Sequence, residues 1–199
     1  MTFAPLVKTI GLMVFSCACT LGWGQAEDTK PHPDALPNEH TVDEVDRPEL
    51  VPYIVKHPQS LPGIVVDETQ AKLAGQWQYS THTPPYVGIG YLHDRKSAKG
   101  ECSVTYVPDL PKAGIYEVRL SHCYNVRRAT NTPVTIRAAD GETTTRINQQ
   151  EIPKHDKLFR SLGKYRFEAG KEGWVRISNN GTDGKYVIAD AVQFLFVEP

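Results

Sequence analysis

Two stretches of the chain combine aromatic rings with hydrogen-bonding side chains and turn residues. The first holds Trp77, Tyr86, Tyr91 and His93, and the second holds Tyr124, Asn125, Arg127 and Arg128. Sugar rings present apolar C–H faces, on which aromatic rings can stack, and hydroxyl rims, which amide and guanidinium groups can bind. Arginine also forms a two-pronged hydrogen bond with a uronic carboxylate. These are candidate ligand-binding residues for a polysaccharide or another cell-surface polymer, unless the aromatics are ordinary core or edge residues of a sheet.

Three carboxylates form a second candidate site, Asp67, Glu68 and Asp190. The first two end the first predicted strand and the third interrupts the last one, and we expect those strands to be neighbours. Carboxylate oxygens are ligands that calcium prefers, so a structural calcium ion could bind there. The alternative is that the carboxylates accept turn or backbone hydrogen bonds without a metal. The sequence indicates no other cofactor.

No spacing in the sequence specifies a catalytic site. The chain contains no G-x-S-x-G, H-E-x-x-H, P-loop or C-x-x-C motif. The enzymatic alternative is a small polysaccharide lyase, in which Tyr124 or His122 abstracts a proton beside a uronic carboxylate and a nearby arginine neutralises that carboxylate. The expected inward direction of His122 argues against this alternative.

Strands must position these residues, because strand-like runs recur at roughly ten-residue spacing between turn signals. The predicted strands are 64–67, 77–80, 102–107, 115–124, 134–137, 143–148, 162–167, 174–178 and 186–197. Residues 68–73 are the one segment that could be helical instead. The pattern predicts an all-β fold, a jelly-roll-like sandwich.

The last two predicted strands read as a β-hairpin from Trp174 to Val197. Between them lies the turn sequence Asn179–Gly184, with two glycines that can adopt positive φ. The second strand is apolar on both faces for most of its length, which is typical of a strand buried between two layers.

The first 26 residues have the features of a secretory signal peptide, with Lys8 before an apolar run and Gly24–Ala26 as a cleavage site. Residues 27–62 hold seven prolines and eight acidic residues, which predicts an extended linker before a domain at 63–199. We therefore expect a secreted, periplasmic or cell-surface protein with no membrane span in the mature chain. The domain has 15 acidic and 18 basic residues without a dense basic stripe, so nucleic acid is not an expected partner.

Two of the cysteines, Cys102 and Cys123, lie after the predicted signal peptide. Export to an oxidising compartment favours a disulfide between them. Strict alternation, however, points their side chains to opposite sides of their strands, so a bridge would need a bulge. The sequence leaves the disulfide and two free thiols as alternatives.

Several stretches resemble the golvesin C-terminal-like, or xanthan lyase-like, domain of bacterial secreted proteins. They are Ile64–Asp67, Gly75–Trp77, Pro84–Tyr91, Tyr106–Val118, Val134–Ile136, Asn148–Gln149, Leu162–Gly163, Phe167–Gly170, Ile177–Gly184 and Val187–Phe194. The resemblance implies a jelly-roll sandwich similar to carbohydrate-binding modules. Such domains also occur at the C-terminus of proteins described as FAD-dependent oxidoreductases, but no glycine-rich dinucleotide fingerprint is present here to imply a flavin.

Three functions are compatible with these features. The sequence favours a non-catalytic module that binds a polysaccharide or another cell-surface polymer. The alternatives are the small xanthan-type lyase and a structural or adhesive protein of the cell envelope.

Overall fold

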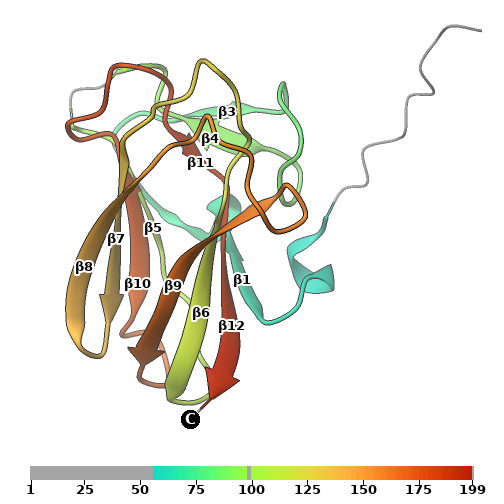
Figure 1. Ribbon diagram of the computed structural model, residues 1–199, viewed down its shortest axis with the longest axis vertical. Helices are drawn as coiled ribbons and strands as arrows, with labels where there is room; N and C mark the ends of the chain where they lie inside the picture. The colour runs from blue at the N-terminus through green and yellow to red at the C-terminus, as the bar shows by residue number, and fades with distance from the viewer. Residues whose placement is uncertain (1–55, 98–99, 199) are drawn as a thin grey trace, which may run out of the picture. The chain divides into compact units, whose positions relative to one another are not determined.

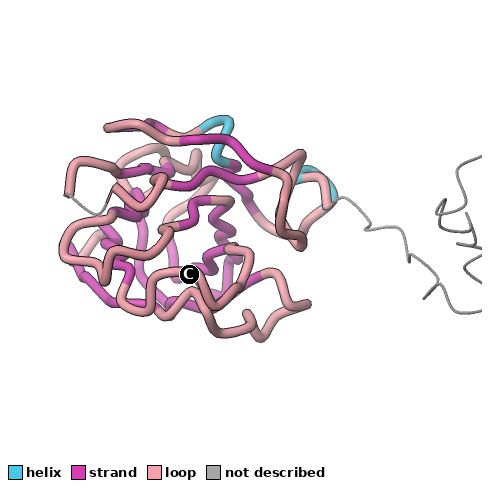
Figure 2. The backbone as a smooth tube through the Cα atoms, turned by 90° about the horizontal axis from the view of Figure 1, so that it is seen from above, coloured by secondary structure: helices cyan, strands magenta, loops and turns pink. Residues whose placement is uncertain are grey.

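The computed structural model describes residues 56–97 and 100–198, so the predicted signal peptide and most of the predicted linker lie outside the described residues. Two antiparallel sheets pack face to face, and a small third sheet lies at one end (Figure 1). Seen from above, loops cover much of that end (Figure 2). The predicted all-β sandwich is confirmed. Among the described residues no helix is long and apolar enough to cross a bilayer.

The four-stranded sheet has the order β1-β12-β6-β9. Its strands are β1 (Ile64–Asp67), β6 (Gly114–Ser121), β9 (Phe159–Phe167) and β12 (Ala191–Glu198). β6 alternates as its sequence predicts, because Tyr116, Val118 and Leu120 are buried while the residues between them are partly exposed. β1 pairs with β12, as we expected for the strands that carry the three carboxylates.

The five-stranded sheet has the order β2-β5-β10-β7-β8. Its strands are β2 (Lys72–Ala74), β5 (Ser103–Tyr106), β7 (Thr132–Ala138), β8 (Gly141–Ile147) and β10 (Trp174–Ser178). β7 and β8 form a hairpin around Gly141, whose φ of 114° suits glycine. This hairpin matches the sequence prediction.

The small sheet has the order β11-β4-β3 and is made of short strands. They are β3 (Gln78–Ser80), β4 (Tyr91–His93) and β11 (Ile188–Ala189). Leu92 and Ala189 are paired across the sheet and both belong to the main core. Because side chains alternate along a strand, Tyr91 and His93 lie on the opposite face.

Two single-turn 3-10 helices complete the elements, η1 (Pro58–Ser60) and η2 (Glu68–Gln70). η2 falls where a helix was the alternative to a strand. The Asp67 carboxylate accepts the Thr69 amide at its start, and the Gln70 side chain accepts the Asp67 amide in return. The chain returns to a strand at Lys72, so the helical segment is one turn long.

The core between the two large sheets combines aliphatic and aromatic side chains. Phe167 meets Tyr116 and Phe194 edge to face, with ring centroids 6.0 and 5.7 Å apart. The Tyr116 hydroxyl reaches the Lys112 carbonyl at 2.7 Å, which satisfies its polar end. These three rings come from β9, β6 and β12, so they form an aromatic cluster on the buried side of the four-stranded sheet.

The predicted hairpin from Trp174 to Val197 is wrong. β10 lies in the five-stranded sheet and β12 in the four-stranded sheet, so the segment between them crosses from one layer to the other. Asn179 begins the crossing as a fully buried amide that accepts from the Cys102 amide and donates to Asp94. The predicted second strand is also divided, because β11 ends before Asp190 and β12 begins after it.

The end of the predicted linker contacts the domain. The Lys56 carbonyl accepts the Gly88 amide at 2.9 Å. The Pro62 carbonyl accepts the buried Gln193 side chain at 2.9 Å. Residues 56–62 therefore pack on the sandwich instead of behaving as a plain spacer.

Of the two alternatives that the sequence left for Cys102 and Cys123, the structure shows free thiols, and both are buried. Cys102 precedes a strand of the five-stranded sheet, where its sulfur lies 3.5 Å from the Gln76 carbonyl. Cys123 follows β6 of the four-stranded sheet and packs with Tyr91 and Ile188. The two thiols thus lie beside strands of different sheets.

Replacing Asp190 with alanine should destabilise the domain by about 1–3 kcal/mol, the cost of leaving buried donors unpaired. Both Asp190 carboxylate oxygens lie 3.2 Å from the Val87 amide, and the Ser121 hydroxyl also donates to this carboxylate. Urea denaturation measures the change. Glu172→Ala, at an exposed carboxylate, is the control, and a loss no larger than the control's would contradict the supporting role of Asp190.

Candidate functional site

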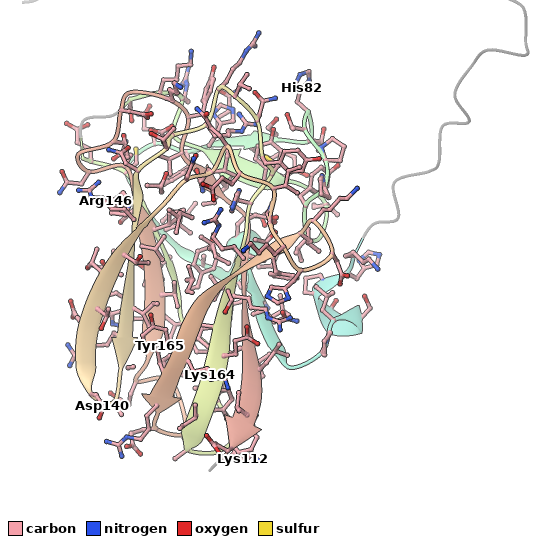
Figure 3. All side chains as sticks on the ribbon, in the orientation of Figure 1. His82, Lys112, Asp140, Arg146, Lys164 and Tyr165 are labelled. Carbon is pink, nitrogen blue, oxygen red and sulfur yellow. The ribbon has the colours of Figure 1, made fainter. Side chains whose placement is uncertain are left out.

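A cleft of about 540 Å³ opens at the end of the domain that carries the small sheet. Its lining residues are Ser80, His82, Thr83, Tyr91, His93, Asn125, Val126, Arg127, Arg128 and Tyr186. Figure 3 shows His82 at this end, with Asp140 and Lys112 at the opposite end of the sandwich. The cleft combines aromatic, hydroxyl, amide and guanidinium groups.

The small sheet forms one wall of the cleft. Ser80 pairs with Tyr91 in the β3–β4 register, so these side chains share the face that points away from Leu92. The Ser80 hydroxyl donates to the Tyr91 hydroxyl at 3.2 Å. The alternation that buries Leu92 in the core therefore presents Tyr91 and His93 to the cleft.

Another wall of the cleft is a loop held by hydrogen bonds from side chains and from the backbone. Asn125 begins a turn in which its side chain accepts the Arg127 amide at 3.0 Å. The Gln150 side chain donates to the carbonyls of Val126 and Arg128, each at 2.9 Å. The Tyr186 amide donates to the Arg127 carbonyl at 3.1 Å. These contacts fix the loop in place beside Tyr186.

Arg128 is the central cation of the cleft and is only 6% exposed. Its guanidinium carbon lies 5.7 Å from the Tyr91 ring centroid and 5.8 Å from that of Tyr186, within cation–π range of both. One terminal nitrogen donates to the Thr83 hydroxyl at 3.2 Å and to the Tyr91 hydroxyl at 3.3 Å. Across residues 56–97 and 100–198, the ion pairs do not include Arg128.

His93 lies against Tyr186, edge to face, with ring centroids 5.1 Å apart. Its Nδ1 accepts the Arg95 amide at 3.2 Å, which places a proton of the neutral ring on Nε2. Burial lowers the pKa of His93, and the positive charge of Arg128 lowers it further. The ring is therefore neutral at pH 7 and can donate one hydrogen bond.

Five of the eight predicted ligand-binding residues line this cleft. Two come from the first predicted group and three from the second, namely Tyr91, His93, Asn125, Arg127 and Arg128. The fold thus brings together two groups that the sequence left separate.

The other three predicted residues lie elsewhere. Trp77 packs against the core and donates its indole N–H to the Ala74 carbonyl at 3.0 Å. Tyr86 packs behind Tyr91, with ring centroids 5.9 Å apart. Tyr124 is half-buried and is not a lining residue. Trp77 and Tyr86 follow the structural alternative, in which aromatics near turns are packing residues.

Sequence reasoning missed Ser80, His82, Thr83, Val126 and Tyr186. Tyr186 was assigned to a long buried strand, although it directly follows a turn and β11 begins only at Ile188. Its position after Gly184 and Lys185 was the one available signal that it belongs to a loop. The hydroxyl residues of 80–83 carry no pattern that separates them from ordinary loop residues.

His122, one of the two proposed bases of a lyase, is not placed for that role. His122 is fully buried, and neither ring nitrogen has a hydrogen-bond partner among the described residues. Burial lowers the pKa of His122 to about 3, and the neighbouring Arg160 acts in the same direction. The ring is a neutral core residue that lies outside the cleft lining.

Asp67, Glu68 and Asp190 do come together, as the sequence predicts. One oxygen from each lies within 4.8 Å of the others, and all three residues are buried. One Asp67 oxygen and both Glu68 oxygens have no hydrogen-bond partner among the described residues. Burial, with Asp67 and then Asp190 nearby, raises the pKa of Glu68 to about 9. Burial also raises the pKa of Asp190 well above its usual value.

This cluster fits a hard divalent cation. Buried carboxylates without partners are costly unless they bind protons or a metal, and calcium takes carboxylate oxygens as ligands. The space is closed by the loop at Gly88, where a Cβ atom would lie 2.7 Å from an Asp67 oxygen. We propose that Asp67, Glu68 and Asp190 hold a structural calcium ion, whose charge would neutralise the cluster and tie β1 to the start of β12.

Two antiparallel sheets packed face to face define a jelly-roll-like β-sandwich. The chain belongs to the Golvesin C-terminal domain family, whose model matches residues 64–196. It is 38% identical over 143 residues to the xanthan lyase of Bacillus sp. (strain GL1), covering 69% of this chain and 15% of that protein. The chain thus spans a small part of this relative.

Solved structures agree with this assignment. The structure of Paenibacillus xanthan lyase matches with a TM-score of 0.63 and 33% identity, over 67% of this chain and 13% of that chain. A GH26-CBM35 β-(1,4)-mannanase from Podospora anserina matches with a TM-score of 0.51 and 15% identity, over 68% of this chain and 28% of that chain. The mannanase match shows the fold alone.

Calcium should raise the melting temperature of the purified domain, and a chelator should lower it, because an ion that binds only the folded state stabilises that state. Glu68→Gln should remove most of this difference, since an amide is a weaker ligand for calcium than a carboxylate. Glu142→Gln, at an exposed carboxylate, should leave the difference unchanged. Equal melting temperatures with calcium and with chelator would rule out the metal. The cluster would then be neutralised by protons on its carboxyl groups.

The free energy of unfolding should fall as the pH drops from about 6.5 toward about 3, partly because of His122. In this window the unfolded chain binds a proton at His122 while the folded chain does not, so protonation favours unfolding. Urea denaturation across the range measures the slope. His122→Leu should flatten it and His57→Gln, at an exposed histidine, should not. Identical slopes for wild type and His122→Leu would contradict the neutral buried ring.

Proposed function

We propose that this domain binds an acidic polysaccharide in the cleft and does not turn it over. The observation that carries the proposal is Arg128, a buried guanidinium between two tyrosine rings that has no carboxylate in ion-pair range among the described residues. A buried cation is costly unless it is paired. A carboxylate on the ligand would supply the missing partner.

The geometry around Arg128 favours a uronic or similarly acidic sugar. Arginine donates in a fixed fork that matches a carboxylate, and both tyrosine rings lie within cation–π range of the guanidinium. The Thr83 and Tyr91 hydroxyls share one terminal nitrogen, so the guanidinium is already oriented before a ligand arrives. Such preorganisation lowers the entropy cost of binding.

Other lining groups suit the rest of a sugar ring. Tyr186 and the neutral His93 provide apolar ring surface next to Arg128. Ser80 and Asn125 provide hydroxyl and amide groups for the hydroxyl rim of a sugar. Lys96, whose ammonium lies 4.8 Å from the Tyr186 ring centroid, adds positive charge beside the cleft. The combination favours an anionic ligand over a neutral one.

The relatives suggest which polymer to test first. Two matched proteins are named xanthan lyases, and this chain corresponds to 15% and 13% of their lengths. Because the matching segment is a small part of each lyase, its role there could be to bind the polymer. The match to this segment alone does not assign the lyase reaction to this chain. Xanthan, an acidic polysaccharide, is therefore the first ligand to test. The predicted signal peptide makes an extracellular polymer the natural target.

Arg128→Gln should weaken binding to xanthan by roughly tenfold to a hundredfold, the loss of a charge-assisted hydrogen bond of about 1.5–3 kcal/mol. Isothermal titration with xanthan and with a neutral polymer measures the effect. Arg128→Lys should recover only part of the affinity, because it keeps the charge but loses the fork and the stack. Added salt should weaken wild-type binding in the same direction.

The neighbouring residue is the matched control. Arg127 is exposed and its change to glutamine should cost less affinity than the same change at Arg128. Melting temperatures of all variants check that the cleft is still folded. Unchanged affinity in folded Arg128→Gln would overturn the site, and unsaturated product released from xanthan by wild type would replace the binding module with a lyase. An absence of glycan binding would favour a structural or adhesive role in the envelope.

A further inference from the structure

The outer face of the five-stranded sheet carries a polar, mainly basic surface that the cleft does not include. Val134, Ile136, Val175 and Ile177 are buried between the sheets. Because side chains alternate along a strand, the residues between them lie on the outer face. No lining residue of the cleft belongs to these five strands. In Figure 1, β8, β7 and β10 show this sheet side by side at the left of the molecule.

One row of this face crosses all five strands. The strand registers align Thr144, Thr135, Arg176, Thr105 and Lys72 as successive cross-strand neighbours. The row runs perpendicular to the strands and spans roughly 19 Å at the usual strand spacing. It consists of three hydroxyls and two cations, with no carboxylate.

The groups in the row are held in place by one another. The Thr135 and Thr144 hydroxyl oxygens are 2.8 Å apart. The Arg176 Nε donates to the Thr105 hydroxyl at 3.2 Å. The Arg176 guanidinium carbon lies 4.3 Å from the Trp174 ring centroid, so indole and guanidinium form a stacked pair. A rigid sheet thus presents a preorganised arginine with an aromatic ring beneath it.

The unpaired charge on this face is positive. Trp174 is flanked by Arg137, and Arg137 pairs with Glu142 at 3.1 Å. On the five strands, Lys72 and Arg176 have no acidic partner within ion-pair distance among the described residues. The outer face therefore offers free positive charge to a ligand along the row, and Glu142 is already neutralised.

We propose that this face, which we call the sheet face (Lys72, Thr105, Thr135, Thr144, Trp174 and Arg176), is a second contact surface for an extended acidic polysaccharide. The proposal rests on the proposed function for the class of ligand, but it assigns a separate site. Hydroxyl and guanidinium groups spaced along one line suit a chain of sugars with carboxylates at intervals. A single stacked aromatic does not provide the series of base-stacking platforms that single-stranded nucleic acids use.

The two surfaces would act together on a long polymer. A chain held at the cleft raises the local concentration of its own neighbouring segments at the sheet face, or allows the domain to link two chains. A short oligosaccharide cannot use both surfaces. The length of the ligand therefore separates the two sites experimentally.

The test is affinity electrophoresis in gels containing xanthan, together with titration of a short uronic oligosaccharide, using the full domain. Arg176→Ala should weaken retention by xanthan roughly two- to tenfold, the range for an exposed cation and its ring contact. Trp174→Ala should have a similar effect, and Arg176→Lys a smaller one. The Arg176→Ala and Arg128→Gln double variant should lose more retention than either single variant. The short oligosaccharide should respond to Arg128→Gln and not to Arg176→Ala.

Lys164→Ala is the control for simple loss of surface charge, since Lys164 is an exposed base on β9 of the other sheet (Figure 3). Retention unchanged in Arg176→Ala but reduced in Arg128→Gln would overturn the sheet face and leave the cleft. Retention reduced in Arg176→Ala alone would overturn the cleft and leave the sheet face. Equal losses of retention for Arg176→Ala and Lys164→Ala would mean that the sheet face binds xanthan only through non-specific charge. Full competition of xanthan binding by single-stranded DNA would lead to the same conclusion.

Discussion

The structure depends on the buried carboxylate of Asp190. This residue stands where the chain leaves the small sheet and enters the four-stranded sheet, between β11 and β12. Its side chain accepts from the Val87 amide and from the Ser121 hydroxyl, while its carbonyl accepts the Tyr106 hydroxyl at 3.3 Å. Four segments that are distant in sequence therefore meet at one residue. A polar group buried this deeply must be satisfied, so the surrounding backbone has little freedom to move.

The loop between β3 and β4 connects this buried centre to the cleft. Val87 donates to Asp190 on the inner side, and Gly88 closes over Asp67. Four residues earlier in the chain, the Thr83 hydroxyl accepts from Arg128 inside the cleft. Tyr91, at the end of the same loop, stacks on Arg128 from β4. A cation bound by the carboxylates would thus fix the loop that shapes the cleft, without touching the sugar.

Charge is separated within the domain in a way that matches these roles. The carboxylates with no partner are buried at the junction of β1 and β12. Arg128 and Arg176, which have no acidic partner among the described residues, lie at the cleft and on the sheet face. In the described part of the chain, four carboxylates that are not buried pair with arginines, as Glu117 does with Arg119 at 2.7 Å and Glu151 with Arg160 at 2.6 Å. The free cations remain where an acidic polymer can reach them.

Local patterns in the sequence determined most of the strands, since alternation in Ile115–Ser121 and the turn at Gly141 need only neighbouring residues to act. The short strands β2 and β4 were not predicted, because their pairing depends on distant partners. The meeting of Asp67, Glu68 and Asp190 was also predictable, because first and last strands often pair. Tertiary structure decided the rest. At the buried Asn179 the chain begins to cross from one sheet to the other, so the expected hairpin does not form and Tyr186 lies in the cleft. Likewise the layers place Cys102 and Cys123 at different sheets, and burial turns Trp77 and Tyr86 into packing residues. Each of these outcomes depends on long-range contacts that no local spacing encodes.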